Sequence, residues 1–197
     1  MKIYGDLNSG NCLKVKWVCD LLGRSYDWIA IDTLKSETRT AEFVAINPAG
    51  QVPVVVFDDG RALAQSNAII RYLGRDSALI PHDPWLTAKM DEWLFWEQYS
   101  HEPYVAVCRY QMVYLGKSAS ELDPDKVRRG HAALALMERH LADKMFLVGP
   151  ALSLADVALL AYTRMAPEGG FSLADYPALQ RWIASCERAL ALPPSAA

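Results

Sequence analysis

The alternation of strand-like and helical segments stops at about Asp76, and this change constrains the fold more than any other feature of the sequence. Before it, short apolar runs alternate with segments of helical periodicity. After it, apolar residues recur at helical spacing and no strand-like segment is found. A chain of 197 residues is long enough for one large domain or two small ones. The sequence therefore predicts an α/β domain at residues 1–76, a linker at residues 77–86 and an all-helical domain at residues 87–197.

The segments of the first domain follow one another in the order βαβ and then ββα. Its last two strands must be antiparallel neighbours, because Asp59-Gly60 between them supplies the positive φ that a tight hairpin turn requires. This order predicts a thioredoxin-like domain built on a mixed four-stranded sheet. The expected strands are Lys2–Tyr4, Tyr26–Ile31, Val54–Phe57 and Arg61–Ala64, and the expected helices are Val15–Leu22, Thr38–Ala45 and one that begins near Ser66.

Helix signals dominate the second domain. Asp123-Pro124 places an N-cap residue before a proline at the first helical position. Ser153 and Asp156 have the spacing of a capping box and are assigned a structural role. The segment from Leu154 to Tyr162 is apolar nearly all round, which predicts a buried central helix. Pro103 is expected to kink the long helix after the linker, because it removes a backbone hydrogen bond.

Charge and composition exclude several classes of function. A net charge of −3 leaves no basic surface for nucleic acid. No apolar stretch approaches the roughly 18 residues of a membrane span and no signal peptide is recognised, so we expect a cytoplasmic protein. The four histidines fit no metal-ligand spacing, and no metal site is predicted. The four cysteines lack Cys-x-x-Cys spacing, which favours reduced thiols.

Two helix starts in the first domain are candidate anion sites. Ser9-Gly10-Asn11-Cys12 lies between the first strand and the first helix, where unpaired N–H groups and the helix dipole favour an anion such as a thiolate. Gln65-Ser66-Asn67 opens the third helix, where a carboxylate could accept hydrogen bonds from the backbone and from Ser66 Oγ. In both places ordinary N-capping is the alternative. The residues alone leave both interpretations open.

Three motifs stand in order along the chain: Asn47-Pro48-Ala49-Gly50-Gln51-Val52-Pro53, then Gln65-Ser66-Asn67-Ala68-Ile69, then Ser153-Leu154-Ala155-Asp156. Together with the βαβ-ββα order, they make the sequence resemble the cytosolic glutathione S-transferases, most closely the bacterial, serine-type, theta- and beta-like members. The likeness covers nearly the whole chain. It implies a glutathione-binding first domain, a helical domain that forms most of an electrophile pocket, glutathione as co-substrate, and a homodimer.

The resemblance also implies the chemistry. Ser9 would donate its hydroxyl to the glutathione sulfur, assisted by Asn11, and the thiolate would attack a small hydrophobic electrophile in a detoxifying conjugation. The backbone of Val52 would bind the cysteinyl part of glutathione, with Pro53 in the cis form. A tyrosine-type mechanism fits poorly, since Tyr4 is expected to pack into the core.

The glutamyl end of glutathione would be held by a second group of residues. Gln65 and Ser66 are assigned to it, although many bacterial and theta-like relatives have Glu in place of Gln65. Gln51 and Lys35 are further glutathione-binding candidates. Lys35 is included because it stands at the same distance before the Asn-Pro motif as a lysine of the beta class.

Two other functions remain open at this point. In one, Cys12 near the start of the first helix has a lowered thiol pKa and acts in glutathione-dependent thiol reduction, or Ser9 supports peroxide reduction. In the other, the chain is a non-catalytic, glutathione-transferase-like binding protein.

The electrophile pocket is expected on the long helix after the linker. Tyr104, Cys108 and Gln111 follow one another at three- to four-residue spacing and can share one helix face. Packing between helices is the alternative role for this face.

Overall fold

The computed structural model describes residues 1–195. The chain forms two compact units, of which the first is Met1–Ser77 and the second begins at Ala78. Helix α4 (Pro84–Trp96) begins inside the segment expected to be a linker, so the last three residues of that segment, 84–86, are helical. Asp83 caps this helix by accepting a hydrogen bond from the backbone of Leu86 at 2.8 Å, and Pro84 occupies its first turn.

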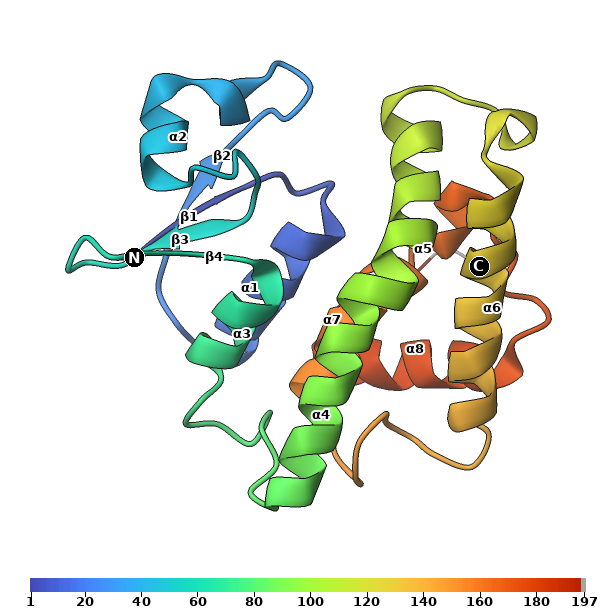
Figure 1. The fold of residues 1–197 in the computed structure, drawn as a ribbon. Coiled ribbons are helices and arrows are strands. Elements are labelled where there is room, and N and C mark those ends of the chain that lie inside the picture. The colour runs from blue at the N-terminus through green and yellow to red at the C-terminus, as the bar shows by residue number, and fades with distance from the viewer. Residues whose placement is uncertain (196–197) are drawn as a thin grey trace. The chain divides into compact units, whose positions relative to one another are not determined.

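The first unit is built on a four-stranded mixed sheet, as expected (Figure 1). The strands lie in the order β2-β1-β3-β4, with β1 parallel to β2 and antiparallel to β3, and with β3 antiparallel to β4. Gly60 has a φ of 83° in the β3–β4 hairpin turn, which confirms the turn inferred from Asp59-Gly60. The strands are β1 (Lys2–Gly5), β2 (Asp27–Ala30), β3 (Val54–Val56) and β4 (Ala62–Ala64).

Strand periodicity assigns the helices of the first unit to opposite faces of the sheet. Side chains alternate along β1, so Tyr4 points to one face while Ile3 and Gly5 point to the other. Tyr4 meets Phe43 of α2 edge-on, with ring centroids 6.3 Å apart. Gly5 lies against Cys12 of α1, and α1 lies beside α3. The helices are α1 (Gly10–Leu21), α2 (Ala41–Ile46), which follows the 3₁₀ turn η1 (Glu37–Arg39), and α3 (Ser66–Leu73).

The second unit is helical, and the described residues contain no strand after β4. Its further helices are α5 (Glu102–Arg109), α6 (Pro124–His140), α7 (Leu154–Thr163) and α8 (Pro177–Ala189), with 3₁₀ turns η4 (Ala119–Glu121) and η5 (Ala166–Gly169). Every residue of α7 is buried, as its apolar sequence predicted. Within residues 1–195, no helix has the length and apolar character that a membrane crossing requires.

Two π-turns interrupt the long helix that starts with α4. The first, η2 (Glu97–His101), precedes Pro103, and the second, η3 (Tyr110–Tyr114), follows α5. Proline carries no N–H and cannot continue the regular ladder. The wider turn closes a hydrogen bond from the backbone N–H of Glu102 to the carbonyl of Glu97 just before that gap. The distortion expected at Pro103 is therefore a π-turn on its N-terminal side.

Asp156 joins three parts of the second unit. Its carboxylate accepts hydrogen bonds from the Ser153 backbone and hydroxyl at 2.9 and 2.8 Å, which confirms the capping box. It also accepts from the backbone of Leu147 at 2.8 Å and from the indole N–H of Trp182 at 2.9 Å. All four donors lie in the interior, so the start of α7 is fixed to α8 and to the segment before α7.

Candidate functional site

Ser9 stands where the loop from β1 enters α1. It is the N-cap residue of the helix, with φ −86° and ψ 120°, and its side chain makes no capping hydrogen bond. The backbone N–H of Ser9 donates to the carbonyl of Asp6 at 3.0 Å, which holds the loop in place. Ser9 is thus a half-buried residue at the positive end of a twelve-residue helix, and its hydroxyl does not cap that helix.

Asn11 connects the start of α1 to the start of α3. Its Oδ1 accepts hydrogen bonds from Ser66 Oγ at 2.9 Å and from Lys14 Nζ at 2.8 Å. Lys14 Nζ also lies 3.5 Å from Oδ1 of Asn67. The structure therefore brings Asn11 and Ser66, two residues with expected roles, into direct contact, and the first helical turn places Ser9 beside them.

The start of α3 has an unusual backbone conformation. Gln65, its N-cap residue, has φ 69° and ψ 109°, in a region that side chains other than glycine rarely adopt. Such a conformation costs on the order of 1–3 kcal/mol, and residues that adopt it cluster at active sites and ligand-binding segments. Gln65 itself is exposed, whereas Ser66 is 5% exposed. The Gln65 side chain makes no capping hydrogen bond.

The loop before β3 is held by Asn47. The amide of this buried residue donates to the carbonyl of Gln51 at 2.8 Å and accepts from the backbone of Ala49 at 3.2 Å. These contacts fix the segment that ends at Val52-Pro53, whose peptide bond is cis, as the resemblance implied. Sequence reasoning treated Asn47 as part of a turn and missed this anchoring role.

Cys12 is the third residue of α1 and has no exposed surface. Burial raises the pKa of its thiol to about 11, and hydrogen bonds from the backbone of Asp6 and from the Ser9 side chain oppose that rise only in part. The lowered thiol pKa expected of a nucleophile is therefore absent. The helix N-terminus does not compensate for the loss of water around this sulfur.

Lys35 lies on the exposed loop between β2 and η1. Its side chain is 77% exposed and pairs with Asp32 at 3.0 Å. The Asp32 carboxylate raises the pKa of Lys35 through this hydrogen bond, so the ammonium stays charged at neutral pH. An exposed pair of this kind is worth little to stability, which leaves the ammonium able to exchange partners.

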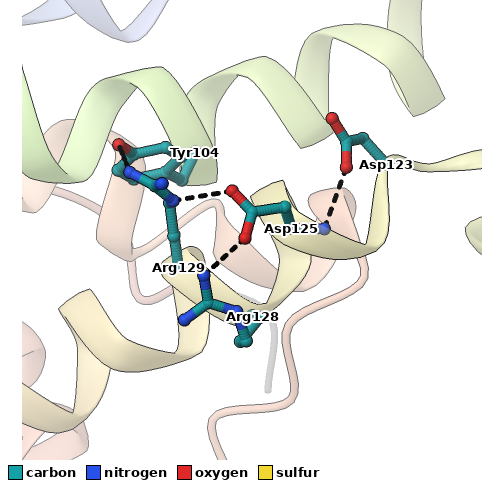
Figure 2. A network of polar contacts seen from close by, with 5 residues as sticks. All are labelled: Tyr104, Asp123, Asp125, Arg128 and Arg129. Atoms are coloured by element: carbon teal, nitrogen blue, oxygen red, sulfur yellow. Dashed lines mark hydrogen bonds and ion pairs between the residues drawn. The ribbon is translucent and has the colours of Figure 1, made fainter.

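The three residues expected to form an electrophile pocket occupy different surroundings. Tyr104 accepts a hydrogen bond from Arg129 at 3.1 Å, and the guanidinium lies over its ring (Figure 2). Cys108 is 1% exposed, and burial raises the pKa of its thiol. Gln111 lies in the π-turn η3 and its amide oxygen is 3.5 Å from Lys117 Nζ.

The Tyr104 contact belongs to a wider polar network on α6. Asp125 pairs with Arg129 at 2.7 Å and with Arg128, and the side chain of Asp123 caps the helix by accepting from the Asp125 backbone at 2.9 Å (Figure 2). The charge of Asp125 therefore offsets part of the positive charge of Arg128 and Arg129.

Lys14 is the functional candidate that sequence reasoning missed. It lies one turn before Val18 and one residue before Val15, on the apolar face that the helical spacing predicts is buried. A lysine on such a face is unusual, and its position there was the signal available in the sequence.

Within residues 1–195, no group of histidine, cysteine, aspartate and glutamate side chains could hold a metal ion.

Both units match known protein families. Family models for the N-terminal and C-terminal domains of glutathione S-transferase match residues 8–76 and 91–189. The crystal structure of a glutathione S-transferase from Pseudomonas fluorescens Pf-5 is 42% identical, covers 100% of this chain and 97% of its own, and superposes with a TM-score of 0.92. Glutathione S-transferase D6 of Drosophila melanogaster is 25% identical over 192 residues, which are 95% of this chain and 87% of that protein.

A more distant structure was solved with a ligand. Ure2p in complex with glutathione is 20% identical, covers 96% of this chain and 90% of its own, and has a TM-score of 0.84. At this level of identity the comparison shows a shared fold only, and the bound glutathione is an observation about Ure2p.

Proposed function

Because this chain belongs to the glutathione S-transferase family, we propose that it binds glutathione and conjugates its thiolate to small hydrophobic electrophiles. The observation that carries this proposal is the start of α1. There the Ser9 hydroxyl is not used as a cap, and Asn11 is bonded to Ser66 at the start of a second helix. Two helix N-termini with polar side chains suit a ligand that carries a thiolate and a carboxylate.

The energy required for thiolate formation is within reach of these groups. A free cysteine thiol titrates near ~8.5, and lowering its pKa by ~2 requires ~2.7 kcal/mol of preference for the anion. A hydrogen bond from the Ser9 hydroxyl to the thiolate contributes ~1.5–3 kcal/mol. The N-terminus of α1 adds ~0.3–1 kcal/mol, or up to ~2 in a partly buried position. Asn11 is assigned a second donor role, and Ser9 itself never becomes a nucleophile.

The other binding roles follow the sequence expectation. The backbone of Val52 pairs with the cysteinyl part of glutathione, oriented by Pro53. Gln65 and Ser66 hold the γ-glutamyl carboxylate, with Ser66 Oγ as a donor. The local contacts that support these roles are the Asn47 anchor of the loop before β3 and the positive φ of Gln65. Gln51 and Lys35 are proposed as further contacts, and the exposed Lys35 ammonium can reach a carboxylate by leaving Asp32.

The electrophile side and the assembly are also proposals. Tyr104, Cys108 and Gln111 are proposed to border the pocket, although the Arg129 contact and the burial of Cys108 show that two of them also serve packing in the second unit. A homodimer is supported by the exposed aromatic side chains of α4 and η2. Trp85, Phe95 and Tyr99 are 72%, 77% and 83% exposed, and large apolar groups of this kind mark interaction surfaces.

The decisive test concerns Ser9. Wild-type protein is expected to lower the pKa of bound glutathione, measured by the ultraviolet absorbance of the thiolate. Ser9→Ala should raise that pKa by about 1–2 and lower kcat/KM for an aryl halide by about tenfold or more. An unchanged thiol pKa in Ser9→Ala would remove Ser9 from the mechanism.

A substrate panel separates conjugation from the alternatives. We expect turnover with aryl halides, epoxides or isothiocyanates in the presence of glutathione. Activity with hydroperoxides alone would point to peroxide reduction, and glutathione binding without turnover would identify a non-catalytic binding protein. Thiol reduction through Cys12 is disfavoured by the raised pKa of that thiol.

A further inference from the structure

Lys14 carries a charge into the interior of the first unit. Its side chain has no exposed surface, and it lies in α1 one turn after Asn11. Its ammonium donates to Asn11 Oδ1 at 2.8 Å and reaches Asn67 Oδ1, in the first turn of α3, at 3.5 Å. Burying an ammonium group is costly unless its protons are bonded, so the two amide oxygens are held against it.

An ammonium group fixes the orientation of an asparagine amide. Rotation of χ2 exchanges the carbonyl and NH₂ ends, which have nearly the same shape. Lys14 has three donors and no acceptor, so it accepts only the carbonyl end of Asn11 as its neighbour. Ser66 Oγ also donates to Oδ1, at 2.9 Å. A hydroxyl can donate or accept, and Ser66 therefore cannot enforce the orientation by itself.

We propose that Lys14 is a positioning residue, which keeps Nδ2 of Asn11 turned toward the sulfur of bound glutathione and keeps Oδ1 turned away from it. This inference rests on the proposed function. Lys14 does not touch the reacting atoms, and it acts through Asn11.

Ligand binding makes the role of Lys14 larger. The Ser66 hydroxyl has one proton, and when it donates to the γ-glutamyl carboxylate it no longer donates to Asn11 Oδ1. Lys14 then holds the amide in the occupied site. The ammonium thus links the site for the glutamyl carboxylate at α3 with the site for the thiolate at α1.

The charge of Lys14 also has a direct effect that must be separated from positioning. Its field lowers the pKa of Cys12, the residue that follows Asn11, and therefore reaches the start of α1. Replacement of Lys14 would remove both the field and the orientation. A double-mutant cycle that combines substitutions of Lys14 and Asn11 distinguishes the two effects, because the orientation effect requires the Asn11 amide and the field effect does not.

The first experiment compares Lys14→Met with Lys16→Met. Methionine is also unbranched, is only one atom shorter than lysine and suits a buried position. We expect Lys14→Met to raise the thiol pKa of bound glutathione by about 1, and to change the dissociation constant of S-methylglutathione less than about twofold, because that analogue forms no thiolate. Lys16 lies on the same helix, is 35% exposed and pairs with Asp20, so Lys16→Met should leave both quantities unchanged.

The second experiment is the double-mutant cycle of Lys14→Met and Asn11→Ala, with the thiol pKa of bound glutathione as the measured quantity. Asn11→Ala should raise the thiol pKa by a similar amount, and adding Lys14→Met to it should raise the pKa little further. If Lys14→Met still raises the pKa by about 1 in the Asn11→Ala background, the ammonium acts through its own field and the proposal is overturned.

A measurement on the wild type covers the case in which Lys14→Met does not fold. The side-chain amide resonance of Asn11, assigned by its loss in Asn11→Ala, should titrate with the same pKa as the thiolate absorbance of bound glutathione. A resonance that does not move through this titration overturns the proposal. A wild type that binds glutathione without lowering its thiol pKa overturns the proposed function as well, whereas a lowered pKa that Lys14→Met leaves unchanged overturns this inference alone.

Discussion

Cys12 and Ser9 share the same helix start and differ in their access to water. Ser9 is half-buried, whereas Cys12 has no exposed surface and burial raises the pKa of its thiol to about 11. A helix N-terminus stabilises an anion by about 2 kcal/mol at most, which is too little to offset the loss of hydration. The position of a cysteine near a helix start therefore does not by itself predict a nucleophile.

Alkylation of Cys12 checks this conclusion. With a pKa near 11, the thiolate fraction at pH 7.5 is on the order of 0.03%, against roughly 10% for an exposed cysteine thiol of pKa ~8.5. We expect negligible modification by iodoacetamide at pH 7.5, rising as the pH approaches 11, and full modification after unfolding. Peptide mass spectrometry reads each cysteine separately. A glutathione adduct on Cys12 after treatment with oxidised glutathione would instead favour thiol reduction.

Gly130 lies inside a helix at a position where packing requires a glycine. It lies in α6, and a Cβ there would stand 2.4 Å from two ring atoms of Phe171. Phe171 is 1% exposed and its ring also meets His131 edge-on, with centroids 5.1 Å apart. The close approach of ring and helix backbone is possible because position 130 has no side chain.

Replacement of Gly130 by alanine should therefore destabilise the protein, although alanine is the better helix former by about 1 kcal/mol. Overpacking costs typically ~1–3 kcal/mol, and we expect a net loss measurable by thermal unfolding. The double variant Gly130→Ala/Phe171→Leu provides the control, because the smaller side chain makes room for the Cβ. A higher melting temperature for Gly130→Ala alone would contradict the packing argument.

At the scale of elements, α6 and α7 both begin with a cap that contains an aspartate. The two caps differ in burial, and we therefore expect them to contribute differently to the free energy of unfolding. Asp123 caps α6 in solvent, with one hydrogen bond to the Asp125 backbone. Asp156 has no exposed surface and accepts four hydrogen bonds. Removing a buried acceptor leaves its donors unsatisfied, which costs far more than losing an exposed cap.

The two caps give a matched pair of variants. Asp156→Ala should lower the free energy of unfolding by about 3 kcal/mol or more, because the Trp182 indole and the backbone N–H groups of Leu147 and Ser153 lose their acceptor. Asp123→Ala should cost ~0.5–2 kcal/mol. Denaturant titration of both proteins measures the difference. Equal losses would show that the bonds of Asp156 beyond the cap contribute nothing.

Local signals predicted some elements well and others not at all. The Asp59-Gly60 turn and the Ser153–Asp156 spacing each determine geometry within a few residues, and both were confirmed. The π-turns were missed because a one-residue widening leaves the apolar pattern on either side intact. Gln111 falls in the second π-turn, so the regular spacing that grouped it with Tyr104 does not hold there.

Contacts between residues far apart in the sequence limit how much of the candidate site can be predicted from the sequence. Ser9, Asn11 and Ser66 could be proposed from their places at helix starts, but nothing in the sequence indicates that Asn11 and Ser66 bond across 55 positions. The sequence does signal an unusual lysine at position 14, on the apolar face of α1, but it does not show which groups that lysine contacts. Its role depends on oxygen atoms supplied by two separate helix starts, which a single helical pattern does not reveal.

At the scale of the whole molecule, the charge divides between the units in a way that bears on ligand binding. Residues 1–76 contain nine basic and nine acidic side chains, so the net charge of −3 falls on the remainder of the chain. An anionic tripeptide would therefore be held by helix dipoles and individual side chains of the first unit, with no general attraction. Its affinity should depend only weakly on salt concentration, which is measured by glutathione binding at low and high ionic strength. A steep loss of affinity with salt would contradict this picture.

The homodimer is tested at the same scale. Sedimentation velocity should show a dimer for the wild type, and Phe95→Glu/Tyr99→Glu should shift it toward the monomer, because charges would replace two exposed aromatic side chains of one face. Met145→Glu is the matched control, since Met145 is also exposed, at 61%, but does not belong to that face. A dimer that withstands the double substitution would place the interface elsewhere.

The two π-turns bear on how the sequences of relatives should be aligned. A π-turn is an α-helical turn lengthened by one residue, so η2 and η3 can each have entered the chain as a single-residue insertion. Relatives that lack them should be one residue shorter at 97–101 or at 110–114. A gap placed elsewhere in this helix would shift by one position every residue between that gap and the true insertion. Residues with proposed roles, Tyr104 and Cys108 among them, would then be matched to positions about 100° away around the helix.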